Sequence, residues 1–274
     1  MDLALRTAVV LLPLLYVGVA AGYGWMFFAD HRVPRKAARP LFHATLTLHL
    51  LYLILLTIRW QQFPYATVSQ ALSATAFAVA VVYAFVEWHG KASSTGFLIL
   101  SIAALFEVLS SLLRTPNPPY REIFHNPLFS THAGFGLLGY AAFAVAAGYG
   151  FLFLRLYHEI KRRRFSIFFG KLPPLEVLER LMVGALVTGF VALGGSVVSG
   201  AVWAEQVFQG AWLSDPKILF TVATWVFYGM ALTLRRLRHW HGRQTAIASL
   251  LGFAAVLFSM IAVNFFLTDV HGFH

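Results

Sequence analysis

The sequence predicts an all-α polytopic transmembrane protein, a helical bundle with about eight spans and both termini outside. The chain has 274 residues, of which 59% are hydrophobic and 12% charged, whereas soluble domains are usually about 45–50% apolar. Stretches long enough to cross about 30 Å of hydrocarbon recur along it. Lys and Arg alternate in number from one side of these stretches to the other, which indicates a fixed orientation.

Eight apolar stretches are expected to form the spans, each roughly 20 residues or longer. Their approximate ranges are 3–28, 40–59, 66–87, 94–113, 131–157, 175–203, 216–234 and 245–268. The first stretch is too long for a signal-peptide apolar region and lacks a small-residue cleavage pattern. We expect a single transmembrane domain, 1–274, with a four-span N-terminal part, 1–115, and a C-terminal core, 130–274.

Positively charged residues are distributed unevenly between these stretches. Sixteen of the 21 Lys and Arg residues fall in the first, third, fifth and seventh connections, and five fall on the other side. Because Lys and Arg are retained on the cytoplasmic side, the odd connections are predicted to be cytoplasmic. We interpret the basic run 161–164 as a membrane anchor, compatible with contact to anionic lipid headgroups. The net charge of +10 therefore does not indicate nucleic acid.

The composition also excludes several kinds of chemistry. The chain contains no cysteine, so disulfides, thiolate metal sites, iron–sulfur clusters and thiol nucleophiles are excluded. No internal repeat, glycine-rich phosphate loop or nucleotide-binding fingerprint occurs in the sequence, so energy coupling within this chain is unsupported. Histidine is then the obvious ligand for a soft metal. No catalytic activity of the chain on its own is predicted.

His132 is the first candidate for function, at the start of the fifth predicted span. Three glycines follow it, Gly134, Gly136 and Gly139, and they leave a small helix surface that a neighbouring helix or a flat ligand can approach. The alternative is an interfacial histidine beside a close helix contact.

His271 lies just beyond the eighth span, and the orientation places it on the same outer face. Two imidazoles at one interface can supply both axial ligands of a haem iron, or bind another transition metal; a polar terminus is the alternative for His271.

The outer connection between the sixth and seventh spans is rich in aromatic residues. Trp203, Phe208 and Trp212 recur at spacings of five and four, so on a helical segment they could form a shelf for a planar porphyrin. An ordinary interfacial anchor is the alternative. Asp215 and Pro216 match the cap and first position of the seventh span, a structural role.

Ionisable residues also lie inside the predicted spans, where they are expensive and often functional. His43 and His49 are six residues apart in the second span, about 240° around a helix, so they do not share a face. His49 is near the middle of the span, and it is either a buried ligand or a hydrogen-bonded interior group. Glu107 and Arg114 lie in or at the end of the fourth span.

Several of these residues form an ordered pattern in the C-terminal half. It comprises His132; the segment 200–204 with Trp203; Trp212; Asp215, Pro216 and Lys217; the segment Thr224 to Tyr228; and Val263, Asn264 and Phe265 before His271. In order, spacing and sidedness it resembles the cytochrome c assembly family, the tryptophan-rich haem-handling membrane proteins of CcsA and HemX type. The resemblance covers roughly residues 130–271. It is weaker in the N-terminal half, where His49 and Arg59 carry it.

The resemblance implies that His132 and His271 are axial haem ligands and that the tryptophan-rich loop holds the porphyrin. The chain departs from the family pattern at four positions. Ser214 stands where a tryptophan is expected, Ile218 where a glutamate is expected, and Phe208 where another tryptophan is usual. Thr233 stands where synthases of the family carry a membrane histidine. The chain therefore resembles the degenerate branch of the family rather than a complete haem-translocating synthase.

These observations lead to one functional hypothesis and two alternatives. The hypothesis is a multi-pass inner (plasma) membrane protein of cytochrome c biogenesis, which holds haem at the outer face between His132 and His271 over Trp203 and Trp212. Its partners would be apocytochrome c or other biogenesis membrane proteins. The first alternative is a regulatory or scaffolding membrane protein of haem biosynthesis that has lost haem transfer. A small-molecule transporter has less support, because no paired interrupted helices are evident.

Overall fold

The structure is a computed structural model that describes residues 2–29, 32–90, 93–114, 126–164, 166–208, 215–237, 240 and 242–259. In these ranges the chain forms helices joined by connections, and the same ranges contain no strand. The chain divides into two compact units. Unit 1 comprises Met1–His125 and His158–Pro174, and unit 2 comprises Asn126–Tyr157 and Leu175–His274.

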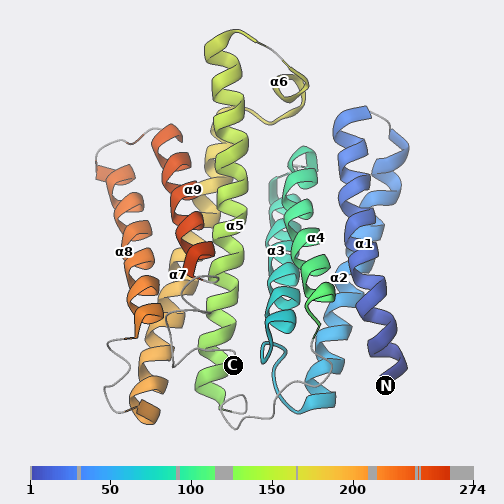
Figure 1. The fold of residues 1–274 in the computed structure, drawn as a ribbon. Coiled ribbons are helices and arrows are strands. Elements are labelled where there is room, and N and C mark those ends of the chain that lie inside the picture. Colours follow the sequence, from blue (N-terminus) through green and yellow to red (C-terminus); the bar gives the residue numbers. More distant parts are fainter. Residues whose placement is uncertain are drawn as a thin grey trace. The chain divides into compact units, whose positions relative to one another are not determined.

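Unit 1 is built from long helices of the N-terminal half. They are α1 (Asp2–Ala29), α2 (Arg32–Trp60), α3 (Val68–Gly90) and α4 (Gly96–Leu112), with the 3-10 turn η1 (Ser93–Thr95) and the short helix α6 (Ile167–Lys171). Figure 1 shows α1 beside α2 and α3 beside α4, and α1 also packs on α4. Aromatic rings fill the core: the ring of Tyr23 meets Phe42 and Tyr83 edge-on, at centroid distances of 6.1 and 5.9 Å. All three rings are buried.

Several buried polar side chains of unit 1 form hydrogen bonds between its helices. The Tyr23 hydroxyl donates to one oxygen of the Glu87 carboxylate at 2.8 Å, and the Arg39 Nε–H donates to the other at 3.1 Å. Ser69 and Ser110 each donate to the other's backbone carbonyl, at 2.9 and 2.8 Å, which ties α3 to α4. Buried polar groups are tolerated in a helical bundle when they are paired in this way.

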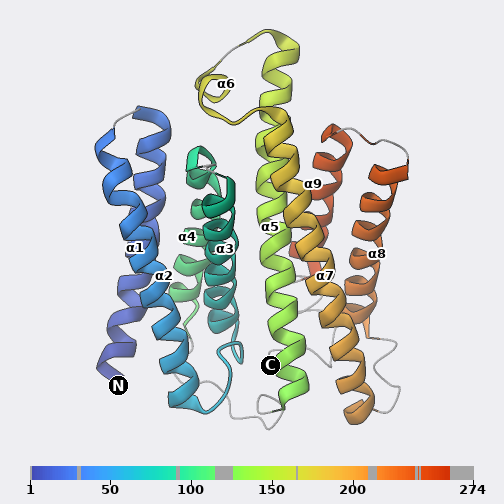
Figure 2. The same cartoon turned by 180° about the vertical axis from the view of Figure 1, so that it is seen from behind.

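Unit 2 is built from α5 (Pro127–Arg162), α7 (Leu175–Phe208), α8 (Pro216–Leu237) and α9 (Gly242–Phe258), and α5 continues past Tyr157 into residues of unit 1. Figure 2 shows α7 alongside α5 and next to α8. The Phe143 ring of α5 stacks on Tyr228 of α8 at 3.9 Å. The Phe190 ring of α7 stacks on Trp225 of α8 at 5.0 Å. These stacked pairs join α8 to two neighbouring helices.

The predicted bundle of helical spans is confirmed, with corrections at several ends. Six of the described helices, α1, α2, α3, α5, α7 and α8, are long and apolar enough to cross a membrane, while α4 and α9 are shorter apolar helices. The prediction ended the sixth span at residue 203, but α7 continues to Phe208. It began the fifth span at residue 131, but α5 begins at Pro127 because Asn126 Oδ1 accepts the backbone N–H of Leu128 at 2.9 Å. It also missed α6. The predicted range 259–268 of the eighth span lies largely outside the described residues.

Asp215 caps α8, as the sequence predicted. Its Oδ1 accepts the backbone N–H groups of Lys217 and Ile218, at 2.9 and 3.3 Å. Replacing Asp215 with alanine is expected to lower the free energy of unfolding by about 1 kcal/mol, because two backbone donors lose their partner. Denaturant titration of the purified protein measures this loss. Asp215→Asn keeps an acceptor oxygen and should lose less; equal losses in both variants would contradict the capping role.

Candidate functional site

His132 lies near the N-terminus of α5, one turn inside the helix, and its ring is held against α7. The Nδ1 atom lies 2.8 Å from the backbone carbonyl oxygen of Ser196. The Ser196 hydroxyl donates to the His132 carbonyl at 2.9 Å and lies 3.1 Å from Nδ1. Because a carbonyl oxygen can only accept, Nδ1 carries the hydrogen, and a neutral imidazole then has its lone pair on Nε2. This is the tautomer that metal-ligating histidines commonly adopt.

A glycine on α7 leaves room for the His132 ring where α5 and α7 approach each other closely. Gly200 of α7 faces it, and a Cβ atom on Gly200 would lie 2.4 Å from Nδ1 of His132. Gly136 and Gly139 of α5 lie against Ser196 and Leu193 of α7, where an added Cβ atom would come within 3.1 Å of its nearest neighbour. The predicted small surface therefore serves the contact between α5 and α7 at Gly136 and Gly139.

The Phe129 ring lies beside the histidine and links it to Trp203. Trp203, which is 3% exposed, contacts the Phe129 ring at 5.1 Å, and the Phe129 ring lies 6.3 Å from the His132 ring. We refer to Phe129, His132, Ser196, Gly200 and Trp203 together as the His132 cluster. The Phe129 ring thus lies near both His132 and Trp203, and Trp203 belongs to the body of α7 rather than to a separate loop segment.

Three members of the His132 cluster were not predicted from the sequence. Phe129 precedes His132 by three residues, so helical spacing places it on the same face. Ser196 and Gly200 are four residues apart on α7 and form a pair of small residues that permits close helix packing. Both spacings were available in the sequence, but which helix packs on α5 was not.

The remaining predicted site residues do not join this cluster among the described residues. Trp212 and His271 lie outside the described ranges, and Phe208 is described only as the last residue of α7. The pairing of His132 with His271 therefore stays a prediction. Asp215 caps α8, and His49 lies in unit 1, where it contacts other side chains of that unit.

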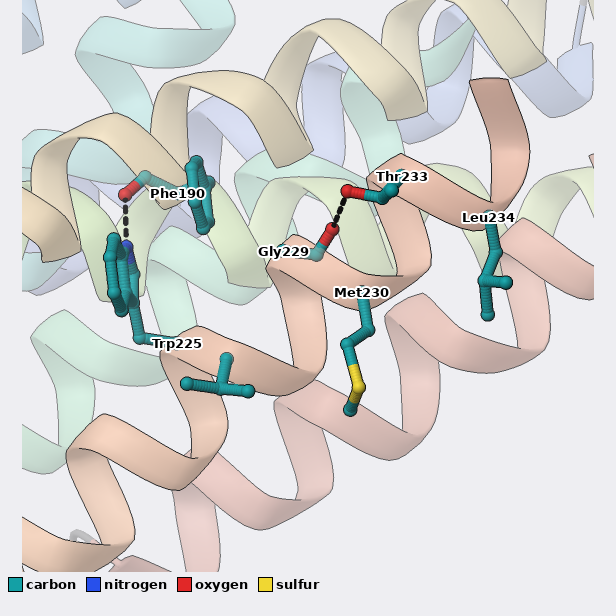
Figure 3. A pocket seen from close by; sticks show the side chains of 7 residues that line it. Phe190, Trp225, Gly229, Met230, Thr233 and Leu234 are labelled. Atoms are coloured by element: carbon teal, nitrogen blue, oxygen red, sulfur yellow. Dashed lines mark hydrogen bonds between the residues drawn. The ribbon is translucent and has the colours of Figure 1, made fainter. Parts of the chain in front are cut away.

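Thr233 lines a cleft of about 400 Å³ at the side of α7 and α8, together with Phe190, Trp225 and Met230 (Figure 3). Its hydroxyl donates to the Gly229 carbonyl of its own helix at 2.8 Å. The Trp225 indole N–H likewise donates to the Phe190 carbonyl at 3.0 Å. None of the residues that line this cleft is a histidine. The Thr233 hydroxyl is thus bound to the backbone of its own helix.

A larger cavity of about 1060 Å³ lies in unit 2 where α8 ends and α7 and α9 begin. Charged side chains line it, among them Arg236, Arg243 and the ion pair of Arg235 with Glu179. No histidine lines this cavity either. Within unit 2, the His132 cluster is therefore where the described residues combine an imidazole with aromatic rings.

Comparison with known proteins identifies the family. The family model described as "Cytochrome C assembly protein" matches residues 44–271. A cytochrome c biogenesis protein CcsA of Prochlorococcus marinus subsp. pastoris is 35% identical over 98 residues, which cover 36% of this chain but only 31% of that relative.

Two more distant relatives match over most of their length. The cytochrome c biogenesis protein CcsA of Trieres chinensis is 22% identical, over 82% of this chain and 83% of the relative. That of Mesostigma viride is 24% identical, over 80% and 81%. The family match spans the His132 cluster and most of the apolar helices. The chain is therefore a multi-pass membrane protein that belongs to the cytochrome C assembly protein family.

Proposed function

We propose that this protein takes part in cytochrome c biogenesis by binding haem at the outer face of the inner (plasma) membrane. The process is supported by the family and by the names of the CcsA relatives. The observation that carries haem binding is the hydrogen bond from His132 Nδ1 to the Ser196 carbonyl, because it directs the lone pair to Nε2. The outer face follows from the distribution of Lys and Arg between the spans.

The side chains present fit a haem group. His132 offers a neutral nitrogen ligand, which suits haem iron, and the chain has no thiolate that would compete. Trp203 and Phe129 add aromatic surface next to the imidazole. In this proposal His132 and His271 hold the iron, and Trp203, Phe208 and Trp212 cover the porphyrin. When bound, the iron would supply ligand exchange, by which haem could pass to an acceptor.

The chain's own residues bind and present the group rather than transform it. The Ser196 carbonyl fixes the orientation of the His132 ring, and Gly200 lets that ring lie close to the backbone of α7. Attachment of haem to a cytochrome c requires thiols, which this chain lacks. The thiols must therefore come from an acceptor, for which apocytochrome c is the proposed partner.

Removal of the two imidazoles tests the proposal. The purified full-length protein is expected to show the absorption spectrum of low-spin haem, and the double variant His132→Ala, His271→Ala is expected to lose it. His43→Ala, which removes an exposed histidine of α2, is the matched control and should keep the spectrum. If the double variant retains its haem content, haem binding at this site is excluded.

Thr233 favours a second candidate function. The hydroxyl at this position is bound to Gly229 and offers no imidazole, as expected for a chain that has lost a transfer step. In this alternative the protein regulates or scaffolds haem biosynthesis. A deletion strain separates the two functions: the first requires impaired maturation of c-type cytochromes, and the second requires normal maturation with altered porphyrin levels.

A further inference from the structure

A chain of four hydrogen-bonded side chains crosses unit 1, with one residue from each of α1, α2, α3 and α4. The Tyr16 hydroxyl lies 2.9 Å from Nδ1 of His49, and Nε2 of His49 lies 3.0 Å from the Ser73 hydroxyl. The Ser73 hydroxyl donates to Oε2 of Glu107 at 2.9 Å. All four residues are buried, and the most exposed of them, Glu107, is only 2% exposed. The proposed haem site uses none of them.

The directions of these hydrogen bonds follow from the number of hydrogens available. Ser73 has one hydroxyl hydrogen and donates it to Glu107, so its oxygen accepts from Nε2 of His49. A neutral His49 then has its lone pair on Nδ1 and accepts the Tyr16 hydroxyl hydrogen. With Glu107 ionised, every hydrogen in the chain therefore points from α1 toward α4.

Glu87 and Glu107, two of the buried glutamates of unit 1, differ in how their charge is compensated. Glu87 forms an ion pair with Arg39 at 3.1 Å. Glu107 contacts Ser73 and lies 3.8 Å from Nε2 of His49, and within the described ranges it forms no ion pair with a lysine or arginine. An ionised carboxylate in an apolar interior is costly unless it is compensated, and a proton is the simplest compensation.

We propose that Tyr16, His49, Ser73 and Glu107 form a buried proton-binding site, in which Glu107 takes up one proton and His49 changes tautomer. The Tyr16 hydroxyl hydrogen passes to Nδ1 of His49, and a proton supplied by water replaces it on the Tyr16 oxygen. The Nε2 hydrogen passes to the Ser73 oxygen, and the former Ser73 hydrogen passes to Glu107. One proton enters, and the products are a neutral carboxylic acid, a hydroxyl and an imidazole protonated on Nδ1.

The protonated form satisfies the same hydrogen bonds in the opposite direction. Glu107 then donates to Ser73, Ser73 donates to Nε2 of His49, and Nδ1–H donates to the Tyr16 oxygen. The helices need not move, because each heavy atom keeps its partner. This reversibility distinguishes the arrangement from a static network, whose hydrogens would be satisfied in one direction only.

Tyr52 is a further titratable group near His49 among the described residues. Tyr52 of α2 lies with its ring 6.2 Å from that of His49, and it interacts electrostatically with Glu107 and with Arg114. From α3, the Phe77 ring lies 5.2 Å from the imidazole. Tyr16 is the contribution of α1 and Glu107 that of α4.

Two spectroscopic signals of the full-length protein in lipid nanodiscs test the proposal. On acidification we expect the infrared C=O stretch of one carboxylic acid to develop. At the same pH the nitrogen NMR signals of His49, assigned by their loss in His49→Asn, should change from the Nε2–H to the Nδ1–H tautomer. In Glu107→Gln both changes should be lost. In Ser73→Ala the infrared band should remain while the tautomer no longer follows it.

Matched variants exist for both positions. Glu87→Gln removes another buried carboxylate of unit 1 and should leave both signals intact. Ser69→Ala removes a serine one turn away on α3 and should also leave them intact. The proposal is overturned if the infrared band persists in Glu107→Gln, or if His49 keeps one tautomer while Glu107 titrates. If a variant fails to fold, the unmodified protein still tests the proposal, because its His49 tautomer either changes at the same pH as the carboxyl signal or does not.

Discussion

Replacing Arg39 with methionine is expected to lower the free energy of unfolding by about 3 kcal/mol. The variant leaves the Glu87 carboxylate, which is 8% exposed, without its cation. Breaking a buried ion pair by removing one partner typically costs about 3–5 kcal/mol. The lower end applies because the Arg39 side chain is itself 37% exposed. Titration with a denaturing detergent, followed by circular dichroism, measures the change.

The matched control neutralises the Glu87 carboxylate instead of removing its cation, Arg39. Glu87→Gln keeps an acceptor for the Tyr23 hydroxyl and carries no charge, so we expect a smaller loss than in Arg39→Met. The double variant Arg39→Met, Glu87→Gln should be more stable than Arg39→Met alone, because no charge is then left unpaired. If adding Glu87→Gln does not restore stability, the uncompensated carboxylate is not the cause of the loss.

Gly200→Ala is expected to weaken haem binding by about 10–100-fold, the range typical of changes that displace a metal-ligating histidine through its surroundings. A Cβ atom on Gly200 would lie 2.4 Å from Nδ1 and 2.8 Å from Cε1 of His132, so the ring must move away from the Ser196 carbonyl. Spectrophotometric titration of the haem-free protein with haem measures the affinity. This prediction depends on the proposed function.

Gly134→Ala is the matched control for this variant. Gly134 lies two residues from His132, and a Cβ atom there would meet no other atom within 4 Å. Its affinity for haem should equal that of the unmodified protein. Equal affinity in Gly200→Ala and Gly134→Ala would show that the contact between His132 and α7 does not orient the ligand.

The fold was largely predictable from the sequence, because hydropathy alone locates helices that must satisfy their backbone hydrogen bonds in lipid. The ends were less predictable. The prediction for α7 ended at Trp203 because the polar residues Glu205 and Gln206 follow, yet the helix continues to Phe208. A helix that leaves the hydrocarbon loses no backbone hydrogen bonds by continuing, so polarity marks the membrane boundary rather than the helix end.

The candidate site was predictable only in part. Family resemblance indicated His132 and Trp203, which the structure places near one another through Phe129. Ser196 and Gly200 have no chemical signature in the sequence, since serine and glycine occur throughout the spans. Their role depends on which face of α7 turns toward α5, and this is a non-local property that periodicity does not determine.

The same limit applies to unit 1. The sequence marked His49 and Glu107 as expensive residues inside spans, but it left His49 either a buried ligand or a hydrogen-bonded interior group. In the structure both ring nitrogens lie within hydrogen-bonding distance of Tyr16 and Ser73. The sequence did not indicate a role for Tyr16 or Ser73, because tyrosine and serine are common in apolar helices. They come together only because of how each of the four helices is oriented about its own axis.

The length of α5 has a consequence for access to His132. The helix has 36 residues, and its stretch between His132 and Arg155, residues 133–154, measures only roughly 33 Å at 1.5 Å per residue, close to the thickness of a bilayer's acyl-chain layer. His132 precedes the first residue of this stretch, and Arg155 follows the last. A ligand held by His132 would therefore lie at the depth of the glycerol and phosphate groups. Binding and release of this ligand would then need only local exchange at that depth. The helices inside the acyl-chain layer would not have to separate.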